Sequence, residues 1–121
     1  MRTISTGLAC ALVCSAAVAM PAETVFLKEN DNAMTRMMKG MAIRPSGDVD
    51  ADFAAMMIPH HQGAIDMAVA ELRHGRNEQL KRIAQEIIVD QQQEIAAMRL
   101  ALGQKPPAPR PAPTMSGMAV K

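Results

Sequence analysis

The sequence of 121 residues contains neither Trp nor Tyr and only two Phe, at positions 26 and 53. Aromatic side chains supply much of the buried surface in small domains, so this chain must build its core mainly from aliphatic residues and its 12 Met. A core of that kind is expected to be small and marginally stable by itself. We therefore expect a homodimer in which two copies complete a helical bundle.

Cysteine is scarce. The two thiols, Cys10 and Cys14, both fall within the first 19 residues, and neither follows a good lipoprotein box. A chain that loses those residues on export has no thiol and no disulfide. This suits an oxidising compartment, where a cysteine-based metal site would be lost to disulfide formation. The thioether of methionine offers sulfur that neither pairs in this way nor needs deprotonation.

A long apolar run is absent as well. Arg2 is followed by an apolar stretch over residues 4–19, which is shorter than the roughly 20 residues that a membrane-spanning helix needs. Residues 17–19, Ala-Val-Ala, match the pattern at which signal peptides are cleaved. We predict that residues 1–19 are a signal peptide, that Met20 begins the mature chain, and that the protein is periplasmic or secreted.

Neither sign of charge is in large excess. The chain has 13 basic and 12 acidic side chains, and removal of Arg2 with the signal leaves 12 of each. A near-neutral chain gives no indication of nucleic acid or an anionic membrane as a partner. The mature chain, about 100 residues, is enough for one small domain.

Three helices are predicted from apolar periodicity and capping residues, with no strand. A short joint makes the second and third helices an antiparallel hairpin, so the fold class is all-α, a three-helix unit. We divide the chain into a signal peptide (1–19), a Met-rich segment with a short helix (20–45), the hairpin (46–103) and a Pro-rich disordered tail (104–121). The predicted helices are residues 30–42 with Asp31 or Asn32 as N-cap, Asp50 to His74 with Gly75 as C-cap, and Asn77, an N-cap, to Leu102, stopped by Gly103.

The most informative motif is the pair His60-His61, with two thioethers one turn before it and Pro59 directly ahead, where a kink is expected. A helical wheel places all three His on the apolar face of the second helix. A further Met stripe follows helical spacing in the first helix. Imidazole and thioether groups are ligands for soft or borderline metals, above all copper. The predicted metal ligands are His60, His61, Met56, Met57, Met67, Met34, Met37, Met38 and Met41.

The third helix has polar residues, Gln91 and Glu94, in the middle of its apolar face. Pairing the helices about Arg76 puts His61 level with Gln91, and His60 or Met57 near Glu94. A buried carboxylate needs a partner, and carboxylates commonly orient metal-binding His. Gln91, Glu94 and Met98 are therefore predicted to support the ligands.

Two other interpretations stay open. The His, Glu and Gln side chains could form a polar network that only specifies register, which would make the protein a dimeric interaction module without metal. Glu71 and His74 have the Glu-x-x-His spacing of di-iron bundles, although such sites need carboxylates from other helices. No nucleophile with an evident base is present, so we expect no enzymatic activity.

Residues 46–102 resemble the secreted proteins grouped as domain of unknown function 305, of the ferritin-like helical superfamily. The resemblance rests on Met56 to Ala68, which contains the His-His motif, and on Ile83-Ala84, Ile87-Ile88, Gln91, Glu94-Ile95 and Met98. It implies an all-helical, often dimeric domain and, for some members, periplasmic copper binding. The family commonly ends in Trp-Leu, where this chain has Ala101-Leu102.

Together these observations predict an exported protein that buffers, sequesters or delivers copper, as Cu(I), in metal resistance or homeostasis. A copper-transport or efflux protein is an expected partner. Protons compete for imidazole nitrogen, so binding should weaken below about pH 6.

Overall fold

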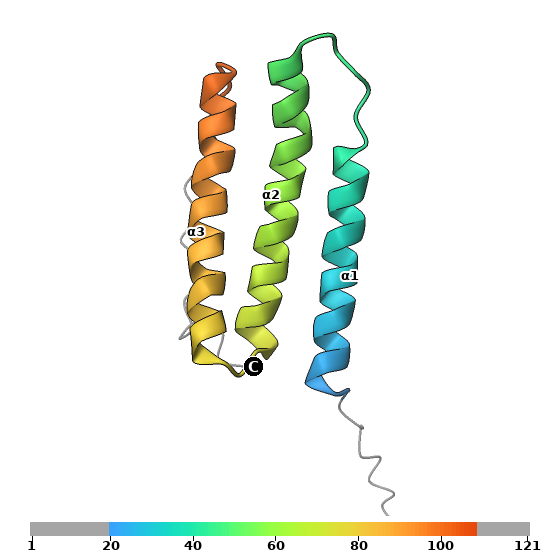
Figure 1. Cartoon of the computed structure of the whole chain (residues 1–121), viewed down its shortest axis with the longest axis vertical. Helices are drawn as coiled ribbons and strands as arrows, with labels where there is room; N and C mark the ends of the chain where they lie inside the picture. The colour runs from blue at the N-terminus through green and yellow to red at the C-terminus, as the bar shows by residue number, and fades with distance from the viewer. Residues whose placement is uncertain (1–19, 109–121) are drawn as a thin grey trace, which may run out of the picture.

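The computed structural model describes residues 20–108. This part of the chain forms three helices and no strand: α1 (Ala22–Met41), α2 (Val49–His74) and α3 (Glu78–Ala101). The predicted all-α fold with a long antiparallel hairpin is confirmed (Figure 1). The predicted signal peptide (1–19) and residues 109–121 of the predicted tail lie outside the described residues.

The hairpin helices are bounded by local hydrogen bonds that the sequence indicates. Asp48 accepts from the backbone N–H groups of Asp50 and Ala51 and so caps α2. The helix begins at Val49, one residue before the predicted Asp50. Asn77 caps α3 in the same way, as predicted. Gly75 is the C-cap of α2, but its φ of −66° is one that any residue adopts. Gly103, with a φ of +69°, follows α3 in the left-handed conformation that favours glycine.

The prediction for the first helix was wrong at its start. α1 begins at Ala22, eight residues before the predicted Asn30, and Pro21 precedes it without a side-chain cap. Tertiary contacts stabilise this early part instead. Glu29 lies 3.4 Å from Arg73 Nη1 and 3.3 Å from His74 Nε2, both at the end of α2.

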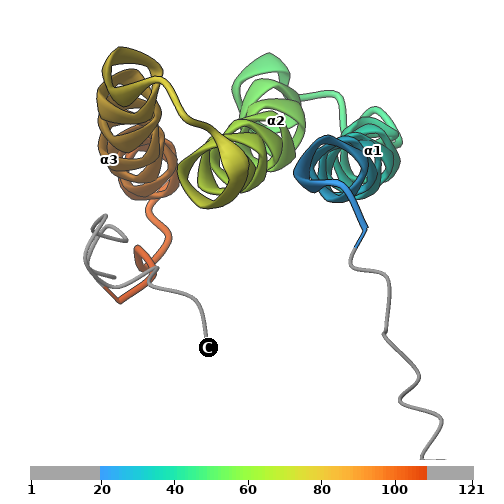
Figure 2. The ribbon, with the colours of Figure 1, turned by 90° about the horizontal axis from the view of Figure 1, so that it is seen from below.

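The three helices form a layer with α2 in the middle (Figure 2). Within the described residues α2 contacts both neighbours, whereas α1 and α3 do not contact each other. The main apolar cluster lies between α2 and α3, and Ile88 is its one large side chain with less than 2% exposure. The cluster consists of Ile65, Ala68, Leu72, Ala84, Ile88 and Ile95, with Ile58, Val69 and Met98 packed against it.

α1 packs against α2 through small residues. A Cβ built on Gly40 would lie 2.6 Å from the Cβ of Pro59, and one built on Gly63 would lie 2.9 Å from the Sδ of Met37. Arg36 donates to Asp66 at 2.8 Å nearby. These contacts set an antiparallel register in which the numbers of facing residues add to about 100. α2 is helical on both sides of Pro59.

Candidate functional site

The two adjacent histidines have different surroundings. His61 is 9% exposed, whereas His60 is exposed. Their ring centroids are 5.9 Å apart and the ring planes make an angle of 65°. Successive helical residues point about 100° apart, so His61 faces α3 while His60 lies on the side of α2 that none of the described helices covers.

Both ring nitrogens of His61 are engaged. Nδ1 lies 2.7 Å from the carbonyl oxygen of Met57, and Nε2 lies 2.7 Å from Oε2 of Glu94. A carbonyl only accepts, so Nδ1 carries a proton and donates it. Nε2 lies within hydrogen-bond distance of the Glu94 carboxyl group, so it is occupied as well. His61 therefore has no lone pair free for a metal unless one contact is broken.

Glu94 corrects two details of the sequence interpretation. Its side chain is 56% exposed rather than buried, and its partner is His61 rather than His60 or Met57. The extended joint Gly75–Asn77 carries the chain past the end of α2 before α3 begins, which shifts the pairing by about three residues. Gln91 donates from Nε2 to Glu94 Oε2 at 3.1 Å, so the predicted imidazole–carboxylate–amide group exists around His61.

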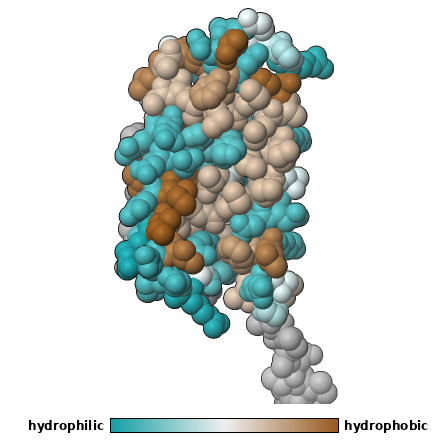
Figure 3. Space-filling model, viewed as in Figure 1, coloured by the Kyte–Doolittle hydropathy of each residue, from teal (hydrophilic) through white to brown (hydrophobic). Residues whose placement is uncertain are grey.

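One broad side of α2 is open. α3 covers the side that contains His61 and Leu72, and α1 covers the side that contains Gly63 and Asp66. At about 100° per residue, Met56, His60 and Met67 point between these two sides. Met56 and His60 are exposed, and Met67 is partly exposed. Figure 3 views the layer from this side and shows apolar surface extending over the helices.

The Met stripe of α1 divides into three positions relative to α2. Met37 packs against Gly63. Met34 and Met41 flank the contact line on the open side, and Met38, 60% exposed, points further away. The register puts Met41 level with His60 and Met34 level with Met67. We call the open surface between α1 and α2, bordered by Met34, Met41, Met56, His60 and Met67, the Met–His groove.

The remaining predicted thioethers lie elsewhere. Met57 is half-buried and uses its backbone carbonyl to hold His61, and Met98 packs against the α2–α3 cluster. Among residues 20–108, no three His, Cys, Asp or Glu side chains lie close enough together to hold a metal ion. A site with three or more side-chain ligands in this part of one chain would therefore have to include thioethers.

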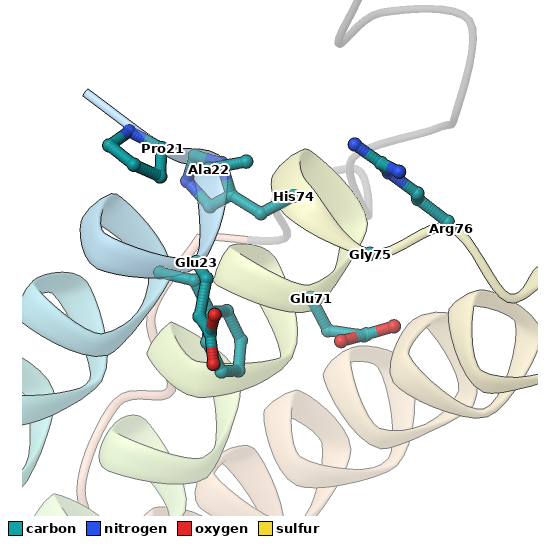
Figure 4. A pocket seen from close by; sticks show the side chains of 8 residues that line it. Pro21, Ala22, Glu23, Glu71, His74, Gly75 and Arg76 are labelled. Atoms are coloured by element: carbon teal, nitrogen blue, oxygen red, sulfur yellow. The ribbon is translucent and has the colours of Figure 1, made fainter.

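A cavity of about 440 Å³ lies at the opposite end of α2 (Figure 4). It is lined by Glu23 at the start of α1, by Glu71 and His74 at the end of α2, and by Arg76 in the joint that follows. His74 Nε2 is buried, and its contact with the Glu29 carboxylate at 3.3 Å does not have the geometry of a hydrogen bond. Glu71 and His74 have no convergent carboxylates from α3 in the described chain, so one chain does not supply the ligands of a di-iron bundle.

None of the described helices is both long and apolar enough to span a membrane. No curated protein and no solved structure matches the chain. The family model for the domain of unknown function 305 matches residues 15–102, which include all three helices, the His60-His61 motif and the Glu94 partner. The chain belongs to the domain of unknown function 305 family.

Proposed function

We propose that this protein binds copper as Cu(I) in the Met–His groove and buffers, sequesters or delivers it outside the cytoplasm. The observation that carries the proposal is the position of His60. Its imidazole is exposed, one helical turn after Met56 and level with Met41 across the groove. Two thioethers and one imidazole are a donor set that suits Cu(I), which accepts soft ligands at low coordination number.

The groove supplies a second pair of thioethers two helical turns away. Met67 of α2 is level with Met34 of α1, and Met34 is 45% exposed. Large Met side chains at exposed positions are not needed to fill a core. Their flexibility lets the sulfur atoms move toward an ion without movement of the helices. The groove thus offers two positions for copper, one beside Met41, Met56 and His60 and the other beside Met34 and Met67.

His61 has a different role in this proposal. Its contacts with Met57 and Glu94 attach the middle of α2 to α3. This attachment holds the backbone beside His60 and so positions the ligand without binding copper. Of the predicted pair, His60 is the ligand and His61 is a positioning residue.

The exposure of the groove favours exchange over permanent storage. A partner protein can approach an ion held by His60 and Met41 from the open side of the layer, and no described helix covers that side. Copper delivery to a transport or efflux protein with its own thioether ligands would follow by exchange of one ligand at a time. The proposal includes no catalytic step.

The test is a titration of the protein with Cu(I) in competition with a colorimetric chelator, at neutral pH and at pH 5. We expect competition at neutral pH and weaker binding at pH 5, because protons compete for the His60 imidazole. No competition at neutral pH would exclude the proposal. Equal binding at both pH values would remove His60 from the site and leave thioethers alone.

The hydrogen bonds of His61 support a second candidate, a helical interaction module without metal in which this group specifies register. In that case Cu(I) would leave the melting temperature unchanged. Under the copper proposal, ligand binding to the folded state raises it.

A further inference from the structure

α1 is held in the molecule by less buried apolar surface than α3 is. Among the described residues of α1, only Ala33 is buried, whereas α3 buries Ile88 and Ile95 against α2. The main apolar cluster of the described chain includes no residue of α1. Because burial of apolar surface is the main favourable contribution to helix packing, the free energy that holds α1 on α2 is the smaller of the two.

The side of α2 that faces α1 is built from small residues. Gly63 lies against Met37. Ala70, seven residues later and on the same side of α2, is buried and nearly level with Ala33. Such residues let two backbones approach closely, but their packing removes little apolar surface from water. Close approach of α1 to α2 therefore does not imply strong attachment.

Ion pairs also join α1 to α2, but they lie at the surface. The side chains of Arg36 and Arg73, which pair with Asp66 and Glu29, are 63% and 52% exposed. His74, beside Glu29, adds a charge only when it is protonated. Water screens pairs of this kind, and they contribute little to stability. The charged contacts thus do not make up for the missing apolar core between these two helices.

The connection between α1 and α2 leaves α1 room to move. Residues 42–48 form no helix, and most of them are exposed. Figure 1 shows this segment as an open arc beyond the ends of both helices. Only three residues, 75–77, join α2 to α3. A longer exposed segment can absorb the backbone rotations of a hinge, so α1 can swing away while α2 stays on α3.

A released α1 would not keep its helical structure. Asn30, Asp31 and Asn32 lie in its middle and Gly40 near its end, and these residue types have low helix propensity. A helix of this length and composition is marginal in water without tertiary contacts. Its backbone amides would therefore exchange with solvent whenever α1 leaves α2.

We propose that α1 is a detachable helix: it leaves α2 while the α2–α3 hairpin stays folded, and Cu(I) in the Met–His groove holds it in place. The second half rests on the proposed function. Met34 and Met41 belong to α1, whereas Met56, His60 and Met67 belong to α2. An ion bound by both helices requires α1 to be in place, so binding and attachment are coupled. Release of α1 takes one thioether from each copper position and favours transfer to a partner.

Hydrogen exchange of the metal-free full chain tests the release by itself. The amides of residues 30–37 in α1 are compared with those of residues 86–93 in α3, both away from the helix ends. We expect the α1 amides to exchange at least roughly ten-fold faster, relative to their rates in an unfolded chain. Equal protection would show that the helices open together and would overturn the proposal, whatever the protein does with copper.

Exchange in the presence of Cu(I) tests the coupling. At a free Cu(I) concentration about 100 times the dissociation constant, exchange in α1 should slow by up to about 100-fold. The combined variant Met34→Leu and Met41→Leu, at the same free Cu(I) concentration, should show no such slowing. Copper binding without slower exchange in α1, or equal slowing in the variant, would contradict the coupling. Absence of copper binding in the chelator titration would exclude the proposed function, while metal-free exchange still decides whether α1 detaches.

Ala33 offers a variant that favours release. Ala33→Asp puts a carboxylate at a position only 1% exposed, which is unfavourable unless the charge is paired. Asn32→Asp, at an exposed neighbour, is the control and should exchange like the wild type. We expect Ala33→Asp to lose protection in residues 30–37 and to bind Cu(I) as weakly as the combined methionine variant, while residues 86–93 stay protected. Loss of protection in both helices would overturn the proposal.

Discussion

Gly40 of α1 lies directly against Pro59 of α2, since a Cβ on Gly40 would be 2.6 Å from the Pro59 Cβ. The contact joins a glycine inside one helix to a proline inside the next. Together with the contacts of Met37 with Gly63 and of Arg36 with Asp66, it sets the antiparallel register in which Met41 lies nearly level with His60. The close approach of α1 to α2 thus aligns two of the proposed copper ligands.

Gly40→Ala tests this contact because two effects have opposite signs. Helix propensity alone favours Ala over Gly by about 1 kcal/mol. The added Cβ would overlap the rigid proline ring, and overpacking costs about 1–3 kcal/mol. We expect urea denaturation to show a lower free energy of unfolding for Gly40→Ala. The control is Lys39→Ala, at an exposed position, whose free energy of unfolding should be unchanged. An increase in stability for Gly40→Ala would show that the helices are further apart.

Ile88 is the side chain on which the hairpin core most depends, because it is fully buried. Ile88→Ala removes buried atoms and leaves a cavity, which typically costs about 2–5 kcal/mol. Val89 is the next residue and is 39% exposed, so Val89→Ala should lower the free energy of unfolding much less. The free energy of unfolding is compared at one protein concentration, so that any association between chains contributes equally to both variants. Equal losses for both variants would contradict the packing of α2 on α3.

Glu94→Ala leaves Nε2 of the buried His61 without its partner at 2.7 Å. We expect the free energy of unfolding to fall by about 1 kcal/mol, the lower end of the cost of an unpaired buried group. The cost is low because Glu94 is more than half exposed, so water can take its place beside His61. Urea denaturation of Glu94→Ala is compared with Gln93→Ala, an exposed neighbour. Identical midpoints would mean that the contact does not attach α2 to α3.

Met41→Leu and Met67→Leu remove sulfur and approximately conserve side-chain volume. We expect weaker Cu(I) binding with an unchanged melting temperature of the metal-free protein. Met98→Leu is the control, since Met98 packs against the α2–α3 cluster. Wild-type affinity in Met41→Leu and Met67→Leu, and in the combined variant, would place copper outside the Met–His groove.

Much of the fold could be predicted because the hairpin helices carry their boundaries locally. Asn77 and Gly75 have short-range roles that a sequence shows directly. The start of α1 has no such signal, because no side chain caps Pro21 and the early turns depend on contacts with Arg73 and His74. Contacts of that kind join residues more than 40 positions apart and leave no mark in the local pattern.

The residues of the candidate site could be named from the sequence, but their positions relative to α1 and α3 could not. A helical wheel places His60 and His61 on one half of α2, yet it does not show where α1 and α3 pack. Only that packing separates an exposed His60 from a His61 enclosed by Met57 and Glu94. The partner of Glu94 was missed for a related reason, since the length and direction of the joint set the register.

His60 is the residue on which the proposed copper site most depends. The decisive measurement is the Cu(I) dissociation constant of His60→Ala beside that of His74→Ala, a histidine at the far end of α2. We predict that His60→Ala raises the dissociation constant roughly ten-fold or more, without loss of helix content, while His74→Ala binds like the wild type. Wild-type affinity in His60→Ala would contradict the account.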